Sequence, residues 1–156
     1  MRGGRLLSDA LHRYSARVRW TGSTGLGWER YDRAHTAVAP PAEQEVMLTT
    51  GEAKGDPRTL NPEQLLVIAA SSCQMLWFLH LAAKARVDVV AYEDDAEAEM
   101  PPEEGLTRIV LRPRIVVNGD ADEQRISRLA RLAHERCNVA KSLRTPVVVE
   151  ATLERR

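Results

Sequence analysis

The longest apolar pattern in the chain runs from Asn61 to Arg86. No charged residue occurs between Gln64 and Ala83, and apolar residues would fall on every side of a helix formed by this run. Asn61 is a favourable N-cap, and Pro62 suits the first helical position. The pattern therefore predicts a long helix that is buried all round in the core.

The same run approaches the length of a membrane span, which needs roughly 20 predominantly apolar residues. Polar residues such as Ser72 and Gln74 interrupt it, and the sequence contains no second run of this kind. We therefore expect a core helix and no association with a membrane.

Before this helix, apolar and polar residues alternate in the way that half-buried strands require. Three strands are expected, at residues 14–20, 28–38 and 46–49. A glycine-rich turn at 21–27 separates the first two, and Pro40 and Pro41 end the second. A polar loop at 51–60 leads into the helix.

Alternation returns after the helix in two long segments, 87–100 and 106–117, which predict a hairpin with a turn at 101–105. The first segment ends in the acidic stretch EDDAEAE, which we expect to form a solvated sheet edge. The second segment is basic, so pairing the two strands would place opposite charges side by side. Pro113 indicates an edge or a bulge in the second strand.

The last part of the chain predicts an amphipathic helix and a closing strand. Apolar residues recur at helical spacing over 123–143 and place Cys137 on the buried side. Residues 145–153 then form a strand. Strands, a buried helix, a hairpin, a second helix and a strand follow one another in an order that is typical of an α+β fold.

Length and composition limit the classes of domain and partner. The 156 residues suit one domain at 14–156, preceded by a basic N-terminal tail at 1–13. The 22 basic and 22 acidic residues balance, and only 4% of residues are aromatic, so we expect no nucleic-acid partner. The sequence shows no secretory signal, so we expect a cytoplasmic, reducing location.

The two cysteines are the residues most able to carry chemistry. Cys73 lies in the middle of the first helix and Cys137 in the second, so packed helices could bring the sulfur atoms within disulfide reach. Spacing alone favours inert core cysteines over a redox pair, because buried free cysteine is common. His12 and His134 have no metal-ligand spacing to either cysteine, so we expect no zinc site. We expect no bound metal or cofactor.

The sequence as a whole resembles the OsmC/Ohr family of organic hydroperoxide reductases and osmotically induced proteins. The resemblance extends from about residue 14 to 150 and is carried by Asn61-Pro62-Glu63, ten residues before Cys73, and by a second cysteine near the end of the last helix. The segment YDRAHT at 31–36 looks like a subgroup of the family. One departure is Asn138, because many members have proline directly after the second cysteine.

The resemblance implies an OsmC-like fold, with antiparallel sheets around a long buried central helix, in an intertwined homodimer. It also implies a cysteine-based peroxidase that reduces organic hydroperoxides in oxidative-stress defence and is recycled by an external dithiol reductant. Cys73 matches the peroxidatic cysteine, Cys137 the resolving cysteine and Glu63 the family's glutamate. The family's arginine corresponds to Arg33, with Arg30 as the alternative.

Elementary chemistry is consistent with this set of residues. A thiol, whose pKa is about 8.5, must lose its proton to attack, and an apolar site opposes that loss. A nearby arginine favours the thiolate, and a carboxylate can hold the arginine in place. Glu63 lies ten helical residues, or about 15 Å, from Cys73, so it would serve that cysteine from a second subunit.

Two other interpretations remain open. The chain could be a non-catalytic protein of the same fold that binds an apolar small molecule or senses oxidant. It could also be a structural dimer whose cysteines only fill the core. Turnover of peroxide with a dithiol would distinguish a cysteine-based peroxidase from these two alternatives.

Overall fold

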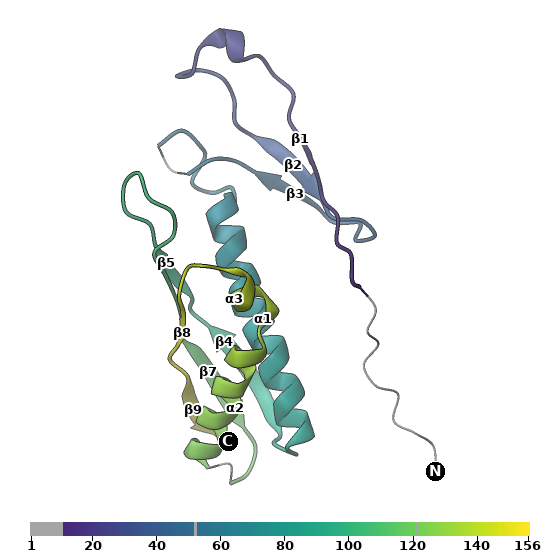
Figure 1. Ribbon diagram of the computed structural model, residues 1–156, viewed down its shortest axis with the longest axis vertical. Coiled ribbons are helices and arrows are strands. Elements are labelled where there is room, and N and C mark those ends of the chain that lie inside the picture. Colours follow the sequence, from purple (N-terminus) through teal and green to yellow (C-terminus); the bar gives the residue numbers. More distant parts are fainter. Residues whose placement is uncertain (1–10, 52, 121) are drawn as a thin grey trace. The chain divides into compact units, whose positions relative to one another are not determined.

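The computed structural model describes residues 11–51, 53–120 and 122–156 (Figure 1). The chain divides into two compact units, one that ends at Pro62 and one that runs from Glu63 to Arg156. Helices and separate small sheets together give the predicted α+β fold. Most of the predicted tail at 1–13 lies outside the described residues, and residues 11–13 have no regular secondary structure.

The first unit is a small antiparallel sheet in the order β1-β2-β3. Its elements are β1 (Arg17–Arg19), the 3-10 helix η1 (Thr24–Leu26), β2 (His35–Val38) and β3 (Glu45–Leu48). Leu48 and Thr49 are the buried residues of its described part, and large side chains such as Trp28 and Met47 stay exposed. This unit therefore has almost no core of its own.

The predicted strand at 28–38 is too long, because only its end, β2, is extended. Residues before β2 form turns that are held by local hydrogen bonds. The Oδ1 atom of Asp32 accepts from the backbone N–H of Ala34 at 2.9 Å, and the indole of Trp20 donates to the Asp32 carbonyl at 2.7 Å. Such bonds compete with the strand ladder, which explains why the alternating pattern does not extend as a strand.

The second unit is built around α1 (Pro62–Lys84), which starts at the proline that the sequence predicted. Two three-stranded sheets accompany it, with the strand orders β4-β7-β9 and β5-β6-β8. Their strands are β4 (Val89–Asp94), β5 (Glu97–Glu99), β6 (Arg108–Leu111), β7 (Pro113–Val117), β8 (Val147–Val149) and β9 (Thr152–Arg155). The remaining helices are α2 (Glu123–Arg136) and α3 (Asn138–Ser142).

The predicted hairpin is present, but each of its strands is shared between the two sheets. β4 pairs with β7 and β5 pairs with β6, both antiparallel. β8 and β9 join as parallel partners of β6 and β7, so each sheet is mixed rather than purely antiparallel. The parallel direction follows from the long connection through α2, which returns the chain to the same end of the sheets.

Arg112 contacts residues at each of the points where the strands break. It lies between β6 and β7, and its backbone N–H donates to Asp94, at the end of β4, at 2.6 Å. Its guanidinium pairs with Glu97 at 2.8 Å and with Glu150 at 3.2 Å. Glu97 begins β5 and Glu150 lies between β8 and β9, so one arginine joins the three breaks at one level.

Two details of the hairpin prediction have different outcomes. The acidic stretch does lie on outer strands, β4 and β5, and Glu93 forms an ion pair with Arg114 on the neighbouring strand. Pro113, however, begins the central strand β7 and is buried, so the expectation of an edge or bulge was wrong. A proline fits there because the first residue of a strand can dispense with a ladder N–H.

Two apolar clusters pack along α1. The carboxyl half of α1, including Phe78 and Leu81, packs with residues of β7 and α2. The amino half, including Ala70, packs with β6, and residues of β8 and of the α3 region adjoin this second cluster. Cys73 lies between Ala70 and Phe78 in sequence, at the point where one cluster gives way to the other.

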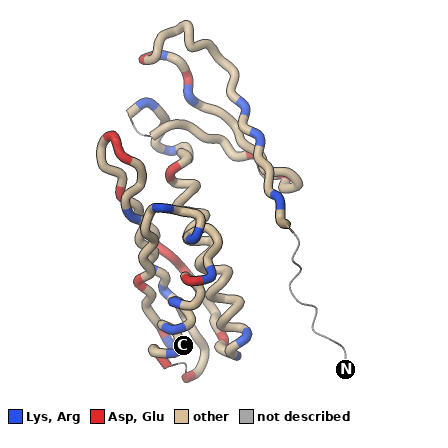
Figure 2. Tube along the Cα trace, viewed as in Figure 1, with Lys and Arg blue, Asp and Glu red and all other residues tan. Residues whose placement is uncertain are grey.

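The sequence pattern predicted that α1 is buried all round, but in a single chain it is not. Its residues at every fourth position form an exposed stripe, in which Ile68 is 50% exposed and Leu76 is 61% exposed. Figure 2 shows that this helix is uncharged over most of its length. α1 is long and apolar enough to cross a membrane, but a core helix passes the same test, and its other side packs into both clusters.

Candidate active site

The structure places Cys137 between two helices rather than inside one. The predicted helix at 123–143 is interrupted at this residue, whose backbone is extended (φ −62°, ψ 109°). Its N–H donates to the His134 carbonyl at 3.1 Å and closes α2. Its sulfur atom accepts from the Ala140 N–H at 3.4 Å and caps α3. Cys137 is only 1% exposed, as predicted from the apolar side of the helix.

Asn138 does not disturb this arrangement. It is the first residue of α3, a position where the backbone N–H has no partner within the helix. Proline suits such a position for the same reason. The helix break at Cys137 therefore forms with asparagine in place of the proline of many relatives.

Cys73 and Cys137 are free thiols that neighbour one another. Cys73 is half-buried on α1, and Cys137 is buried at the junction of α2 and α3. Burial raises the pKa of the Cys137 thiol, and the neighbouring Cys73 thiol raises it further. The structure thus brings two of the four predicted site residues into the same neighbourhood.

Two surroundings of Cys137 act on its thiol in opposite directions. Burial, as the largest cause, and the nearby Cys73 thiol raise the pKa of Cys137. The Ala140 N–H acts in the opposite direction and lowers the pKa of Cys137.

The sequence analysis did not single out Arg136, whose guanidinium lies near the ring of Trp77. The guanidinium carbon of Arg136 lies 5.9 Å from the ring centre of Trp77, near the outer limit of a cation–π contact. Trp77 follows Cys73 by one helical turn, and Arg136 directly precedes Cys137. The only hint in the sequence was the position of a basic residue next to the second cysteine.

The predicted arginine belongs to the first unit, where its guanidinium is engaged locally. Arg33 donates to the carbonyl of Tyr31 at 2.9 Å and to the carbonyl of Trp28. It also lies over the Tyr31 ring, 3.9 Å from the ring centre. Arg30, the alternative, donates to the Leu26 carbonyl at 3.0 Å. Arg33 is therefore the more firmly held of the two.

Glu63 remains distant from the cysteine in its own chain. Both residues belong to one continuous helix, α1, so their separation along its axis is about 15 Å. The structure of a single chain does not bring Glu63 to Cys73.

Gln74 is a buried polar residue that the sequence pattern did not mark as functional. It is 1% exposed, and its Nε2 atom donates to the Ala130 carbonyl of α2 at 3.0 Å. Its Oε1 atom is buried and has no hydrogen-bond partner among the described residues. Leaving such an acceptor unpaired costs about 1–3 kcal/mol.

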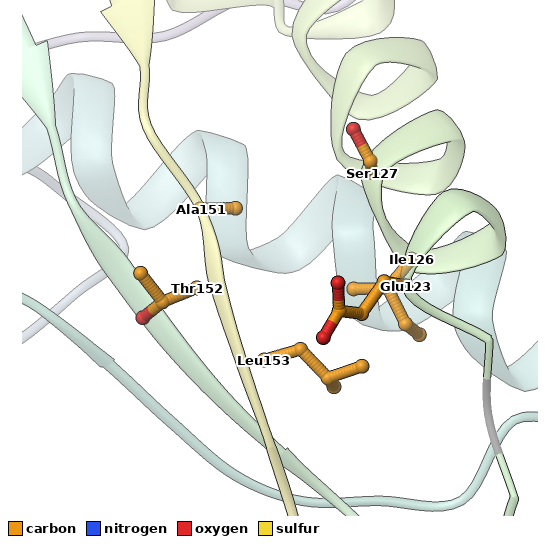
Figure 3. A pocket seen from close by; sticks show the side chains of 6 residues that line it. All are labelled: Glu123, Ile126, Ser127, Ala151, Thr152 and Leu153. Carbon is orange, nitrogen blue, oxygen red and sulfur yellow. The ribbon is translucent and has the colours of Figure 1, made fainter.

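A pocket of about 390 Å³ lies between the start of α2 and β9 (Figure 3). Ile126 and Leu153 contribute apolar surface, and the Glu123 carboxylate extends toward the same space. The pocket is at the opposite end of α2 from Cys137, a distance of about 20 Å along that helix. It is therefore separate from the cysteine pair.

Comparison with known proteins identifies relatives of the whole chain. The family model described as OsmC-like protein matches residues 54–152. An OsmC-like protein of unknown function from Vibrio cholerae is 30% identical, with a TM-score of 0.80 over 91% of this chain and 100% of that one. No curated protein matches the sequence.

Two further solved structures share the fold at lower identity. An organic hydroperoxide resistance protein, OsmC, from Legionella pneumophila is 18% identical, with a TM-score of 0.64 over 94% of this chain and 99% of that one. The organic hydroperoxide resistance protein OhrB of Bacillus subtilis is 21% identical, with a TM-score of 0.60 over 93% and 100% of the two chains.

Proposed function

Because the chain belongs to the family of OsmC-like proteins, we propose that it is a cysteine-based peroxidase that reduces organic hydroperoxides. One observation supports the proposal, namely that the half-buried Cys73 and the buried Cys137 are free thiols that neighbour one another, although they lie far apart in the sequence. The names of the Legionella and Bacillus relatives support the class of substrate.

The proposed reaction uses the two thiols in turn. The Cys73 thiolate attacks one oxygen of the O–O bond, and the other oxygen leaves as an alcohol after taking up a proton. Cys73 is then a sulfenic acid. The Cys137 sulfur attacks it, water leaves, and a disulfide forms. An external dithiol reduces the disulfide by exchange and returns both thiols, so no bound cofactor is required.

Arg33 and Glu63 complete the proposed site. The positive charge of Arg33 would stabilise the Cys73 thiolate, and a carboxylate would hold the guanidinium in position. Glu63 is too far along α1 to do so within one chain. We therefore assign this role to Glu63 of a second copy in a homodimer.

We predict that the protein is a homodimer in solution. The exposed stripe of α1, with Ile68 and Leu76, and the poorly buried first unit are apolar surfaces that a second copy would cover. Light scattering at low micromolar concentration should give about twice the mass of one chain. A stable monomer at that concentration would remove the support for a shared site.

Wild-type protein should form an intramolecular disulfide after one equivalent of an organic hydroperoxide, and it should turn over excess peroxide with a dithiol. Intact-protein mass spectrometry would show the loss of two hydrogen atoms, and the consumption of cumene hydroperoxide with dithiothreitol would show turnover. A fold alone does not establish an activity, so this measurement decides whether the protein is a peroxidase. Reversible disulfide formation without turnover would identify an oxidant sensor instead.

A further inference from the structure

Gln74 places an amide in an otherwise apolar part of the core. Its Nε2 atom is 3.0 Å from the Ala130 carbonyl oxygen, and its Oε1 atom has no partner among the residues that the structure describes. A carbonyl oxygen only accepts hydrogen bonds, so the nitrogen of the amide must be the atom that faces Ala130. The orientation of the Gln74 amide is therefore determined, with its nitrogen as the donor to α2.

A half-satisfied amide is an unfavourable choice for filling a core. Leucine would occupy a similar volume at this buried position without leaving a buried acceptor unpaired. Apolar contacts between helices have little directionality, whereas a buried hydrogen bond specifies one alignment. Setting the register between packed helices is the best-supported use of such a polar contact.

The hydrogen bond between Gln74 and Ala130 joins the two helices that also carry or precede the two cysteines. On α1, Gln74 directly follows Cys73. On α2, Ala130 precedes Cys137 by seven residues, or about 10 Å along the helix. Of two successive residues of α1, Gln74 therefore holds α2 through its amide, and Cys73 neighbours the thiol at the end of the same helix. A shift of α2 along α1 would disturb both arrangements.

We propose that Gln74 is a positioning residue for the cysteine pair. Its amide sets the alignment of α2 against α1 and so keeps the Cys137 sulfur within reach of the Cys73 sulfur. It acts through α2 and takes no part in the bond changes. The inference rests on the pairing of the two cysteines in the proposed function.

The full-length variants Gln74→Leu and Gln74→Met test this role. Both should unfold at a temperature no lower than that of wild type, because they remove the unpaired acceptor and fill the same space. Incubation with mixtures of oxidised and reduced glutathione measures how readily the two thiols become a disulfide. We expect the equilibrium constant for disulfide formation to fall about tenfold, which corresponds to about 30 mV in the potential of the pair.

Phe78→Leu is the matched control. Phe78 lies one turn after Gln74 on α1 and is fully buried in the same cluster. The substitution leaves the amide contact with Ala130 in place. This variant should unfold at a lower temperature yet keep the exchange equilibrium of wild type, so the readout distinguishes alignment from general loss of packing.

An unchanged exchange equilibrium in both Gln74 variants overturns the positioning role, as does an equal fall in Phe78→Leu. The assay contains no peroxide, so it separates this inference from the proposed activity. If wild type forms the disulfide in glutathione but reduces no peroxide, the proposed function fails and the role of Gln74 is judged by its variants. If wild type forms no disulfide with glutathione, both proposals fail.

Discussion

Replacing Cys73 by serine should abolish peroxide reduction completely, whereas replacing Cys137 by serine should leave one round of attack. Cys73→Ser removes the attacking sulfur, so Cys137 should stay reduced. In Cys137→Ser, the attacking thiol remains but the second thiol is missing. Cys73 should then stop at sulfenic acid, and excess peroxide should drive it to sulfinic acid.

The difference between the two serine variants can be measured from their oxidation products, without an assay of turnover. A dimedone-type probe should label Cys137→Ser and not Cys73→Ser after one addition of hydroperoxide, as read by intact-protein mass spectrometry. Both variants should fold. Serine is a good N-cap and can replace Cys137 as the acceptor for the Ala140 N–H, and the cost of a hydroxyl in the core is of order 1 kcal/mol.

Inert core cysteines predict a different result. Both variants would then be slightly less stable and equally unreactive. If Cys73→Ser reacts as readily as wild type, the assignment of the two roles is wrong. The same holds if wild type gains oxygen and never forms the disulfide.

Replacing Arg33 by alanine should slow the attack of Cys73 on peroxide about tenfold at pH 7. A guanidinium near a thiolate typically shifts the ionisation by at least one pH unit, so its loss leaves less thiolate at neutral pH. The rate of alkylation by iodoacetamide, followed against pH, should show the curve displaced to higher pH. The rates of variant and wild type should converge at high pH, because removing the arginine does not change the reactivity of a fully ionised thiol.

Arg30→Ala is the control for Arg33→Ala. Arg30 lies in the same unit and donates to one backbone carbonyl, that of Leu26. Its loss removes a positive charge of the same kind and should leave the alkylation curve unchanged. A displaced curve in Arg30→Ala, with a normal one in Arg33→Ala, would transfer the role to Arg30.

Much of the fold followed from patterns between near neighbours in the sequence. The start of α1 at Pro62, its length and the burial of Cys137 were all predicted from capping and periodicity. The hairpin and its charge pairing, as between Glu93 and Arg114, followed from alternation and complementary charge. These signals are local, because each depends on residues within one or two turns or on directly paired strands.

The breaks within elements were not predictable in this way. At the strand breaks, Arg112 contacts Asp94, Glu97 and Glu150, which come from distant parts of the sequence. The break at Cys137 interrupts an apolar periodicity that continues into α3, so the pattern alone predicted one helix. The continuous pattern was correct about which residues are buried and wrong about where the helix ends.

The sequence by itself therefore determined the class of fold, the central helix and the two cysteines as candidates. Tertiary structure decided that Cys73 and Cys137 are neighbours, that Gln74 holds α2 through Ala130, and that one stripe of α1 stays uncovered in a single chain. The physical reason is that periodicity records which side of an element avoids water, whereas the contact between two particular side chains depends on how separate elements align.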